Sequence, residues 1–268
     1  MPILSQQSKI QQTNEESVMR RKIVVGNWKM NGSLASNEAL LKALVEKIPQ
    51  KISTDIVICA PYPYLFQTQS YLKNSSIRWG AQNVAKFESG AFTGEVSVSM
   101  LKEFGASYVI IGHSERSTAY CESDENIATK LMMVKQADMT PILCVGESLI
   151  EREAGIMEKV VSKQLDTIVE MYGEDIFDET IIAYEPVWAI GSDMAASPEQ
   201  AQTMHQFIRE KLSPNAKVGK SLKIIYGGSV NPQNALQLFS MPDVDGGLVG
   251  RASLNASDFQ SICHSAEI

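Results

Sequence analysis

Short runs of β-branched and other apolar residues recur along the chain, and longer segments with helical spacing of apolar positions separate them. Continuous apolar runs, rather than runs that alternate with polar residues, are typical of parallel strands buried on both faces. The pattern therefore predicts eight such strands. The runs are 23–28 (IVVGNW), 55–60 (DIVICA), 77–82 (IRWGAQ), 108–112 (YVIIG), 141–146 (PILCVG), 180–185 (TIIAYE), 222–227 (LKIIYG) and 244–250 (VDGGLVG).

Amphipathic segments between these runs begin with Ser or Asn, residues that favour helix N-caps. In the last of them Ser197 precedes Pro198, which suits the first helical position. The clearest segments are 37–48, 123–137, 148–173 and 197–212. An unbroken strand–helix alternation of this length favours one (β/α)8 barrel, an α/β fold of about 250 residues. We expect a single barrel domain over residues 19–268, and a disordered, polar extension over residues 1–18 that lacks the apolar region of a secretory signal.

Charge and cysteine content exclude several classes of function. The chain has 24 Lys and Arg against 31 Asp and Glu, a net charge of −7, which argues against non-specific binding to nucleic acid or anionic membranes. No run approaches the roughly 18 apolar residues that span a bilayer. The four cysteines lack metal-ligand spacing, so we expect no zinc site, no disulfide scaffold and a cytoplasmic location. An anionic small ligand would need a local positive site.

Three polar residues follow predicted strands at the end where barrels of this kind place their active sites. Lys29 follows the first run, His113 the fourth and Glu185 the sixth. Taken singly, each has an ordinary structural interpretation: a solvated lysine, a packed histidine and a carboxylate in a salt bridge. Their shared position at strand ends favours a functional role for all three.

The neighbours of His113 and Glu185 indicate their chemistry. Residues 114–116 (SER) suit a first helical turn, whose amides would keep the His113 imidazole neutral and able to donate a hydrogen bond to a substrate oxygen. A carboxylate in a water-poor cavity can act as a general base, which is the role we expect for Glu185. Cys144 has no histidine near it in sequence, so we expect it to pack rather than to act as a nucleophile.

The loops after the sixth, seventh and eighth runs add a lid and an anion site. Pro186 stiffens the start of a loop of mostly small residues, as suits a hinged lid. The predicted lid comprises Pro186, Val187, Trp188, Ala189, Ile190, Gly191, Ser192, Asp193 and Met194. Glycines at 227–228 and 250 let backbone N–H groups approach an anion, and the last two loops are the usual phosphate site of such barrels.

Seven motifs, in order and spacing from about residue 20 to the C-terminus, closely resemble the triosephosphate isomerase family. They are VVGNWKMNG (24–32), GAFTGEVS (90–97), VIIGHSERS (109–117), CVGE (144–147), AYEPVWAIG (183–191), YGGSV (226–230) and LVGRASL (248–254). The resemblance implies an aldose–ketose isomerase of glycolysis and gluconeogenesis. Such an enzyme interconverts dihydroxyacetone phosphate and D-glyceraldehyde 3-phosphate through an enediolate and uses no cofactor or metal.

The resemblance also implies roles for the residues of the catalytic centre. Glu185 would move the proton between C1 and C2, and neutral His113 would polarise the carbonyl and shuttle protons between the enediolate oxygens. Lys29 would stabilise the developing charge, Asn27 would line the same site, and Glu115 resembles the acid that hydrogen-bonds near the lysine.

Further roles implied by the resemblance concern the phosphate, the lid and a partner. Gly191, Ser229, Gly250 and Arg251 would hold the phosphate through backbone N–H groups, and Tyr226 and Ser229 would latch the closed lid over the enediolate. Thr93 lies in a loop that resembles the one entering the partner subunit, so a homodimer is implied.

Two positions depart from the family pattern. The family lid reads Ile-Gly-Thr-Gly-Lys where this chain has Ile-Gly-Ser-Asp-Met, and the loop after the eighth strand carries Gly-Gly where this chain has Gly250-Arg251. We hypothesise that Asp193 and Arg251 pair in the closed lid, or that Arg251 offsets the charge of Asp193. The alternative is that both side chains point to solvent.

Two other interpretations are compatible with the barrel. A pseudoenzyme would keep the fold without turnover, but the intact Asn27, Lys29, His113 and Glu185 argue against it. Another phosphate-binding barrel could act on larger sugar phosphates, although the long lid and the tight spacing of residues at the strand ends favour a triose.

Overall fold

The computed structural model describes residues 20–191 and 195–268. The predicted extension over residues 1–18 and the lid residues Ser192, Asp193 and Met194 lie outside the described residues. The pairing of Asp193 with Arg251 falls outside them as well. Within the described part of the chain, no helix has the length and apolar character needed to cross a membrane.

Eight parallel strands form a closed barrel in which each strand pairs with the next in sequence and β8 pairs with β1. The strands are β1 (Ile23–Asn27), β2 (Asp55–Ala60), β3 (Arg78–Ala81), β4 (Tyr108–Ile111), β5 (Thr140–Val145), β6 (Ile181–Tyr184), β7 (Lys223–Tyr226) and β8 (Gly246–Val249). Each lies within or overlaps one of the eight apolar runs, so the predicted (β/α)8 barrel is confirmed.

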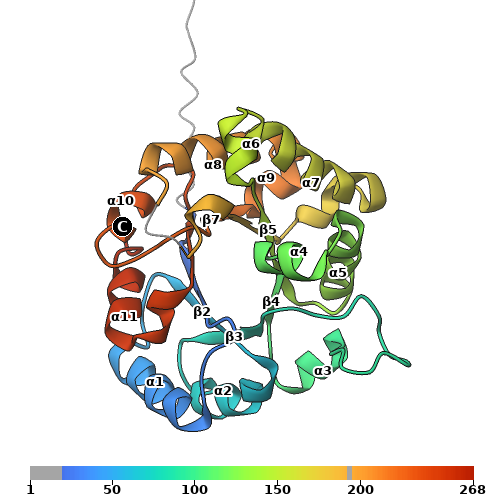
Figure 1. The fold of residues 1–268 in the computed structure, drawn as a ribbon. Helices are drawn as coiled ribbons and strands as arrows, with labels where there is room; N and C mark the ends of the chain where they lie inside the picture. Colours follow the sequence, from blue (N-terminus) through green and yellow to red (C-terminus); the bar gives the residue numbers. More distant parts are fainter. Residues whose placement is uncertain (1–19, 192–194) are drawn as a thin grey trace, which may run out of the picture.

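Helices form a ring around the barrel (Figure 1). The α-helices are α1 (Leu34–Lys47), α2 (Leu65–Leu72), α3 (Val98–Glu103), α4 (Ser114–Tyr120), α5 (Asp124–Gln136), α6 (Leu149–Glu153), α7 (Met157–Tyr172), α8 (Pro198–Leu212), α9 (Ala216–Ser221), α10 (Ala235–Phe239) and α11 (Ala256–His264). The short 3-10 helices are η1 (Tyr62–Tyr64), η2 (Glu174–Phe177), η3 (Val187–Ala189) and η4 (Arg251–Leu254).

Two helix boundaries differ from the sequence prediction. Helix α1 begins at Leu34 rather than near Asn37, because Ser33 and Ser36 form a reciprocal capping box three residues earlier. The segment 148–173 is two helices, because Gly155 adopts a left-handed φ of 68° that ends α6. The predicted N-caps of α5 and α8, Ser123 and Ser197, are confirmed.

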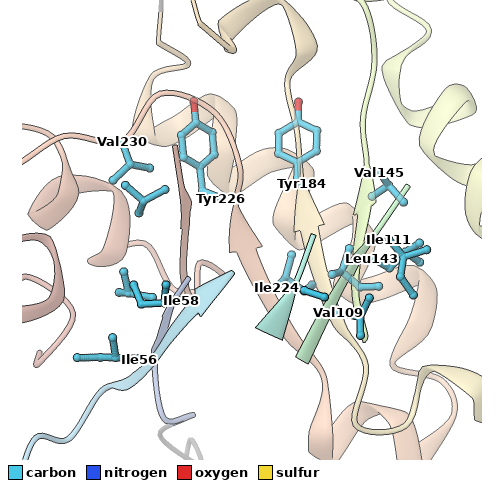
Figure 2. Close-up of a cluster of buried hydrophobic side chains, with 14 of the residues drawn as sticks. Ile56, Ile58, Val109, Ile111, Leu143, Val145, Tyr184, Ile224, Tyr226 and Val230 are labelled. Carbon is cyan, nitrogen blue, oxygen red and sulfur yellow. The ribbon is translucent and has the colours of Figure 1, made fainter. Parts of the chain in front are cut away.

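In every strand except β3, alternate residues enter two different apolar layers. Side chains such as Val25, Cys59 and Ile110 fill the barrel interior. Their strand neighbours, such as Ile58 and Ile111, belong to the larger layer between the sheet and the helices (Figure 2). Burial on both faces explains why the strands read as continuous apolar runs. It also leaves the strand ends as the place where polar side chains meet.

Candidate active site

A cleft of about 770 Å³ opens at the C-terminal ends of the strands. Within the described chain, it brings together loops that follow β1, β4, β6, β7 and β8. Its lining includes the predicted site residues Asn27, Lys29, His113, Gly191, Ser229, Gly250 and Arg251. Residues separated by more than 200 positions in sequence therefore share one cavity.

Lys29 is held in an uncommon conformation at the edge of this cleft. Its φ is 53°, in the left-handed region that non-glycine residues rarely occupy, and its N–H donates to Asn27 Oδ1 at 3.0 Å. Its Nζ lies 2.5 Å from Glu115 Oε1. A Cβ placed on Gly250 would lie 3.4 Å from Lys29 Cε, so the lysine packs directly against the loop after β8. Lys29 is therefore not a freely solvated lysine.

His113 forms the N-cap of α4, as the sequence predicted for the turn that follows it. The Glu115 N–H donates to His113 Nδ1 at 3.3 Å, and the side chain is almost fully buried. A ring nitrogen that accepts a hydrogen bond carries no proton, so the neutral ring has its proton on Nε2. That nitrogen lies 3.0 Å from Glu185 Oε1.

Glu185 follows β6 and is 1% exposed. The Ser114 N–H donates to its Oε2 at 2.9 Å. Glu185 lines a smaller cavity of about 170 Å³ next to the main cleft, together with Cys144, and is not among the residues that line the main cleft. His113 therefore connects Glu185 to the other predicted residues, because it contacts Glu185 and also lines the main cleft.

Two glycines make room for Glu185. A Cβ on Gly146 would lie 1.7 Å from the Glu185 carbonyl oxygen, and one on Gly227 would lie 2.8 Å from Glu185 Cγ. Both positions must therefore lack a side chain. Cys144 lies beside them, and burial together with the Glu185 charge raises the pKa of its thiol. A protonated, buried thiol suits the packing role predicted for it.

Glu147 is a site residue that sequence reasoning missed. Its side chain is 0% exposed and accepts hydrogen bonds from Tyr184 Oη and from Trp188 Nε1, each at 3.0 Å. Arg152 Nη1 lies 3.3 Å from its Oε1. The carboxylate thus connects β6 to Trp188, in the first half of the predicted lid. The available signal was its position just after a buried strand, within the CVGE motif.

A different tyrosine binds the chain just beyond the predicted lid. The buried Ala196 N–H donates to Tyr226 Oη at 3.2 Å. Tyr184 and Tyr226 are paired on β6 and β7, and their phenol oxygens point the same way (Figure 2). Tyr184 on β6 therefore reaches the start of the predicted lid through Glu147, and Tyr226 on β7 binds Ala196 just beyond its end. Ser229 lines the cleft, and its carbonyl accepts from Asn234 Nδ2.

Thr93 lies outside the cleft. It is exposed in the loop between β3 and α3, which extends away from the body of the barrel (Figure 1). Within residues 20–191 and 195–268, no three His, Cys, Asp or Glu side chains are grouped as metal ligands.

Comparison with known proteins identifies the family of the chain. The family model described as "Triosephosphate isomerase" matches residues 22–266. The triosephosphate isomerase of Thiobacillus denitrificans is 55% identical over 249 residues, covering 92% of this chain and 99% of the relative. That of Dechloromonas aromatica is 49% identical, with 92% and 100% covered, and that of Nitrosomonas eutropha 47%, with 92% and 99% covered. The chain therefore belongs to the triosephosphate isomerase family and interconverts dihydroxyacetone phosphate and D-glyceraldehyde 3-phosphate.

Proposed function

We propose that Glu185 and His113 carry the proton transfers of this isomerisation. Glu185 removes a proton from the carbon next to the carbonyl and returns it to the neighbouring carbon, and His113 Nε2–H donates to the carbonyl oxygen. The observation that carries the proposal is a buried carboxylate oxygen 3.0 Å from the Nε2 of a histidine whose Nδ1 accepts a backbone hydrogen bond. A neutral imidazole with its proton on Nε2 can donate directly to the carbonyl oxygen and so polarise the carbonyl.

Glu185 has to move to act on a substrate in the main cleft. Its carboxylate faces Ser114 and His113 and lines the smaller cavity instead. Rotation of the side chain toward the cleft gives up the Ser114 hydrogen bond and carries the oxygen past His113. A carboxylate released from its hydrogen-bond donors in a water-poor site is a stronger base, so this movement favours proton abstraction.

Lys29, Asn27 and Glu115 complete the catalytic centre in this proposal. The Lys29 ammonium stabilises the negative charge that develops on the enediolate oxygens, and Asn27 lines the site and fixes the Lys29 backbone. Glu115 holds the ammonium in place at 2.5 Å. A pre-positioned cation needs no reorganisation when the charge appears.

The phosphate of the substrate is assigned to the glycine-rich loops. Backbone N–H groups of Gly191, Ser229, Gly250 and Arg251 hold it at the rim of the cleft. The lid then closes over the enediolate and excludes water, which prevents loss of phosphate from the intermediate. Tyr226, already bonded to Ala196, secures the C-terminal side of the lid.

Steady-state conversion of D-glyceraldehyde 3-phosphate by the protein and by Glu185→Gln tests the assignment of the base. We expect the variant to lose roughly 100- to 10,000-fold in kcat, the usual contribution of a positioned general base. Glu153→Gln, which changes an exposed carboxylate at the end of α6, is the matched control and should retain full activity. Equal activity of Glu185→Gln and wild type would remove Glu185 from the mechanism.

We also propose that the chain forms a homodimer through the loop that carries Thr93. Large apolar side chains are exposed in the loop after β1 and on α2 and α3, among them Met30 at 96%, Phe66 at 67% and Met100 at 50%. The loop is internally braced, because the rings of Phe87 and Phe92 stack at 3.7 Å. A rigid, partly apolar projection on a chain that exposes further large apolar side chains suits a self-complementary interface.

Sedimentation equilibrium tests the dimer. We expect a mass of two chains for the wild type and of one chain for Met30→Glu, since a buried unpaired charge opposes association. Leu236→Glu is the control, because it places the same charge at a residue that is 51% exposed on α10, across the barrel from α3 (Figure 1). A monomeric wild type at micromolar concentration would refute the proposal.

A cytoplasmic location is supported by the cysteines. All four thiols are free, and Cys59, Cys144 and Cys263 are buried. Free thiols persist where the compartment is reducing. We expect cell fractionation to recover the isomerase activity with cytoplasmic markers, and recovery in an oxidising compartment would refute this assignment.

A further inference from the structure

Arg251 places a cation beside the loops assigned to the phosphate. It follows Gly250 directly, begins η4, and lines the main cleft while remaining exposed. Among the described residues, its side chain makes no hydrogen bond, ion pair or ring contact. The guanidinium is therefore available to a ligand that enters the cleft.

The other charges of the cleft do not favour a dianion by themselves. The Lys29 ammonium is paired with Glu115, and Asp258 adds a carboxylate to the lining. His113 is neutral when its Nδ1 accepts from the Glu115 N–H. The chain as a whole carries a net charge of −7. Of the cations that line the described cleft, Arg251 alone has no acidic side chain paired with it.

The backbone brings this cation close to the assigned phosphate position. A Cβ on Gly250 would lie 4.0 Å from Lys29 Nζ, so the loop after β8 runs against the catalytic lysine, and Arg251 is the next residue. A guanidinium binds phosphate oxygens through a planar set of donors and keeps its charge at every pH relevant to the enzyme. In the assignment proposed above, Lys29 acts at the reacting end of the substrate, and Arg251 adjoins the loop that holds its phosphate.

We propose that Arg251 is a specificity-determining residue of this enzyme, whose side-chain cation selects substrates bearing a dianionic phosphate and steers them into the cleft. The proposal rests on the assignment of the phosphate to the loops after β7 and β8. It adds recognition of the substrate by the side chain to a position whose backbone N–H is assigned to the phosphate and whose side chain we hypothesised to pair with Asp193. The cation acts on encounter and binding and lies one residue beyond the loop that packs on Lys29, so its effect falls on kcat/KM more than on kcat.

Substitutions that change the charge at position 251 measure the effect of the cation on kcat/KM. We expect kcat/KM for D-glyceraldehyde 3-phosphate at low salt to fall about three- to tenfold in Arg251→Gln, as for loss of one nearby cation in a solvated site. Arg251→Glu should fall further, and Arg251→Lys should retain most of the wild-type value. Raising the salt to about 0.5 M should narrow the differences, because ions screen the interaction. Lys159→Gln, which removes an exposed cation of α7, is the control for net charge.

Two comparisons separate this role from a structural one. Unphosphorylated glyceraldehyde should show a much smaller loss in Arg251→Gln than the phosphorylated substrate does, and inhibition by inorganic phosphate should weaken in the same variant. Equal losses for both substrates, or a failure of Arg251→Lys to restore activity, would overturn the proposal. An inactive wild type would instead refute the proposed function, and activity that depends on Glu185 but not on Arg251 would refute this inference alone.

Discussion

Replacing Glu147 should destabilise the protein more than replacing any exposed carboxylate. Its side chain is fully buried and accepts from Tyr184 Oη and Trp188 Nε1, while Arg152 lies within 3.3 Å. Glu147→Ala removes the shared acceptor and leaves the Arg152 cation, whose side chain is 18% exposed, without this carboxylate. Glu147→Gln removes the charge and one of the two acceptor oxygens, and the remaining amide oxygen can still accept from these donors.

The magnitude follows from the partners that are lost. A buried donor deprived of its acceptor costs about 1–3 kcal/mol, and Tyr184 is 1% exposed. Breaking a buried ion pair by removing one partner costs about 3–5 kcal/mol, and the partial exposure of Arg152 places this pair at the lower end. We therefore expect Glu147→Ala to cost about 3–5 kcal/mol and Glu147→Gln about 1–2 kcal/mol.

Urea unfolding at one fixed protein concentration measures these differences, because the proposed dimer makes stability depend on concentration. Thermal unfolding should show the Glu147→Ala midpoint lower by roughly 6–20 °C for a chain of this size. Glu153→Ala, at an exposed position of the neighbouring helix α6, should change the free energy of unfolding by less than about 0.5 kcal/mol. A loss below about 1 kcal/mol in Glu147→Ala would refute the reasoning.

Three further outcomes are expected. Tyr226→Phe leaves the buried Ala196 N–H without its acceptor and should cost about 1–3 kcal/mol, with faster hydrogen exchange of that amide; unchanged exchange would contradict the assignment. Gly146→Ala places a Cβ where Glu185 O lies 1.7 Å away, so the strand ends must shift, and activity should fall even where circular dichroism shows a folded barrel. Burial lowers the pKa of His205 from 6.5 to about 4, so this residue contributes stability above pH 6.5 that is lost as the pH falls toward 4, about 3 kcal/mol in total. His205→Gln should flatten the pH dependence of unfolding over that range, and an unchanged slope would exclude this histidine as its source.

Local sequence signals were sufficient for much of the fold. Strands buried on both faces are apolar at most positions, and continuous apolar runs indicated all eight of them. The charged residues Asp55, Arg78 and Lys223 stand at the first positions of β2, β3 and β7. Helix boundaries were predicted less well, because several nearby residues can each serve as the cap of a helix. Ser33 caps α1 ahead of Asn37, and Gly155 ends α6 within what read as one helix.

Lys29, His113 and Glu185 could be proposed from the sequence because each lies within two residues of the end of a strand, and a parallel barrel brings all such ends to the same side. The chain by itself therefore determined the barrel and the shared location of these residues at the C-terminal ends of its strands. The direction of the Glu185 carboxylate depends on a Ser114 N–H 71 residues away, and the role of Glu147 depends on donors from β6 and the lid. Only the tertiary structure decided these contacts, because hydrogen bonds between distant segments leave no periodic pattern in the sequence.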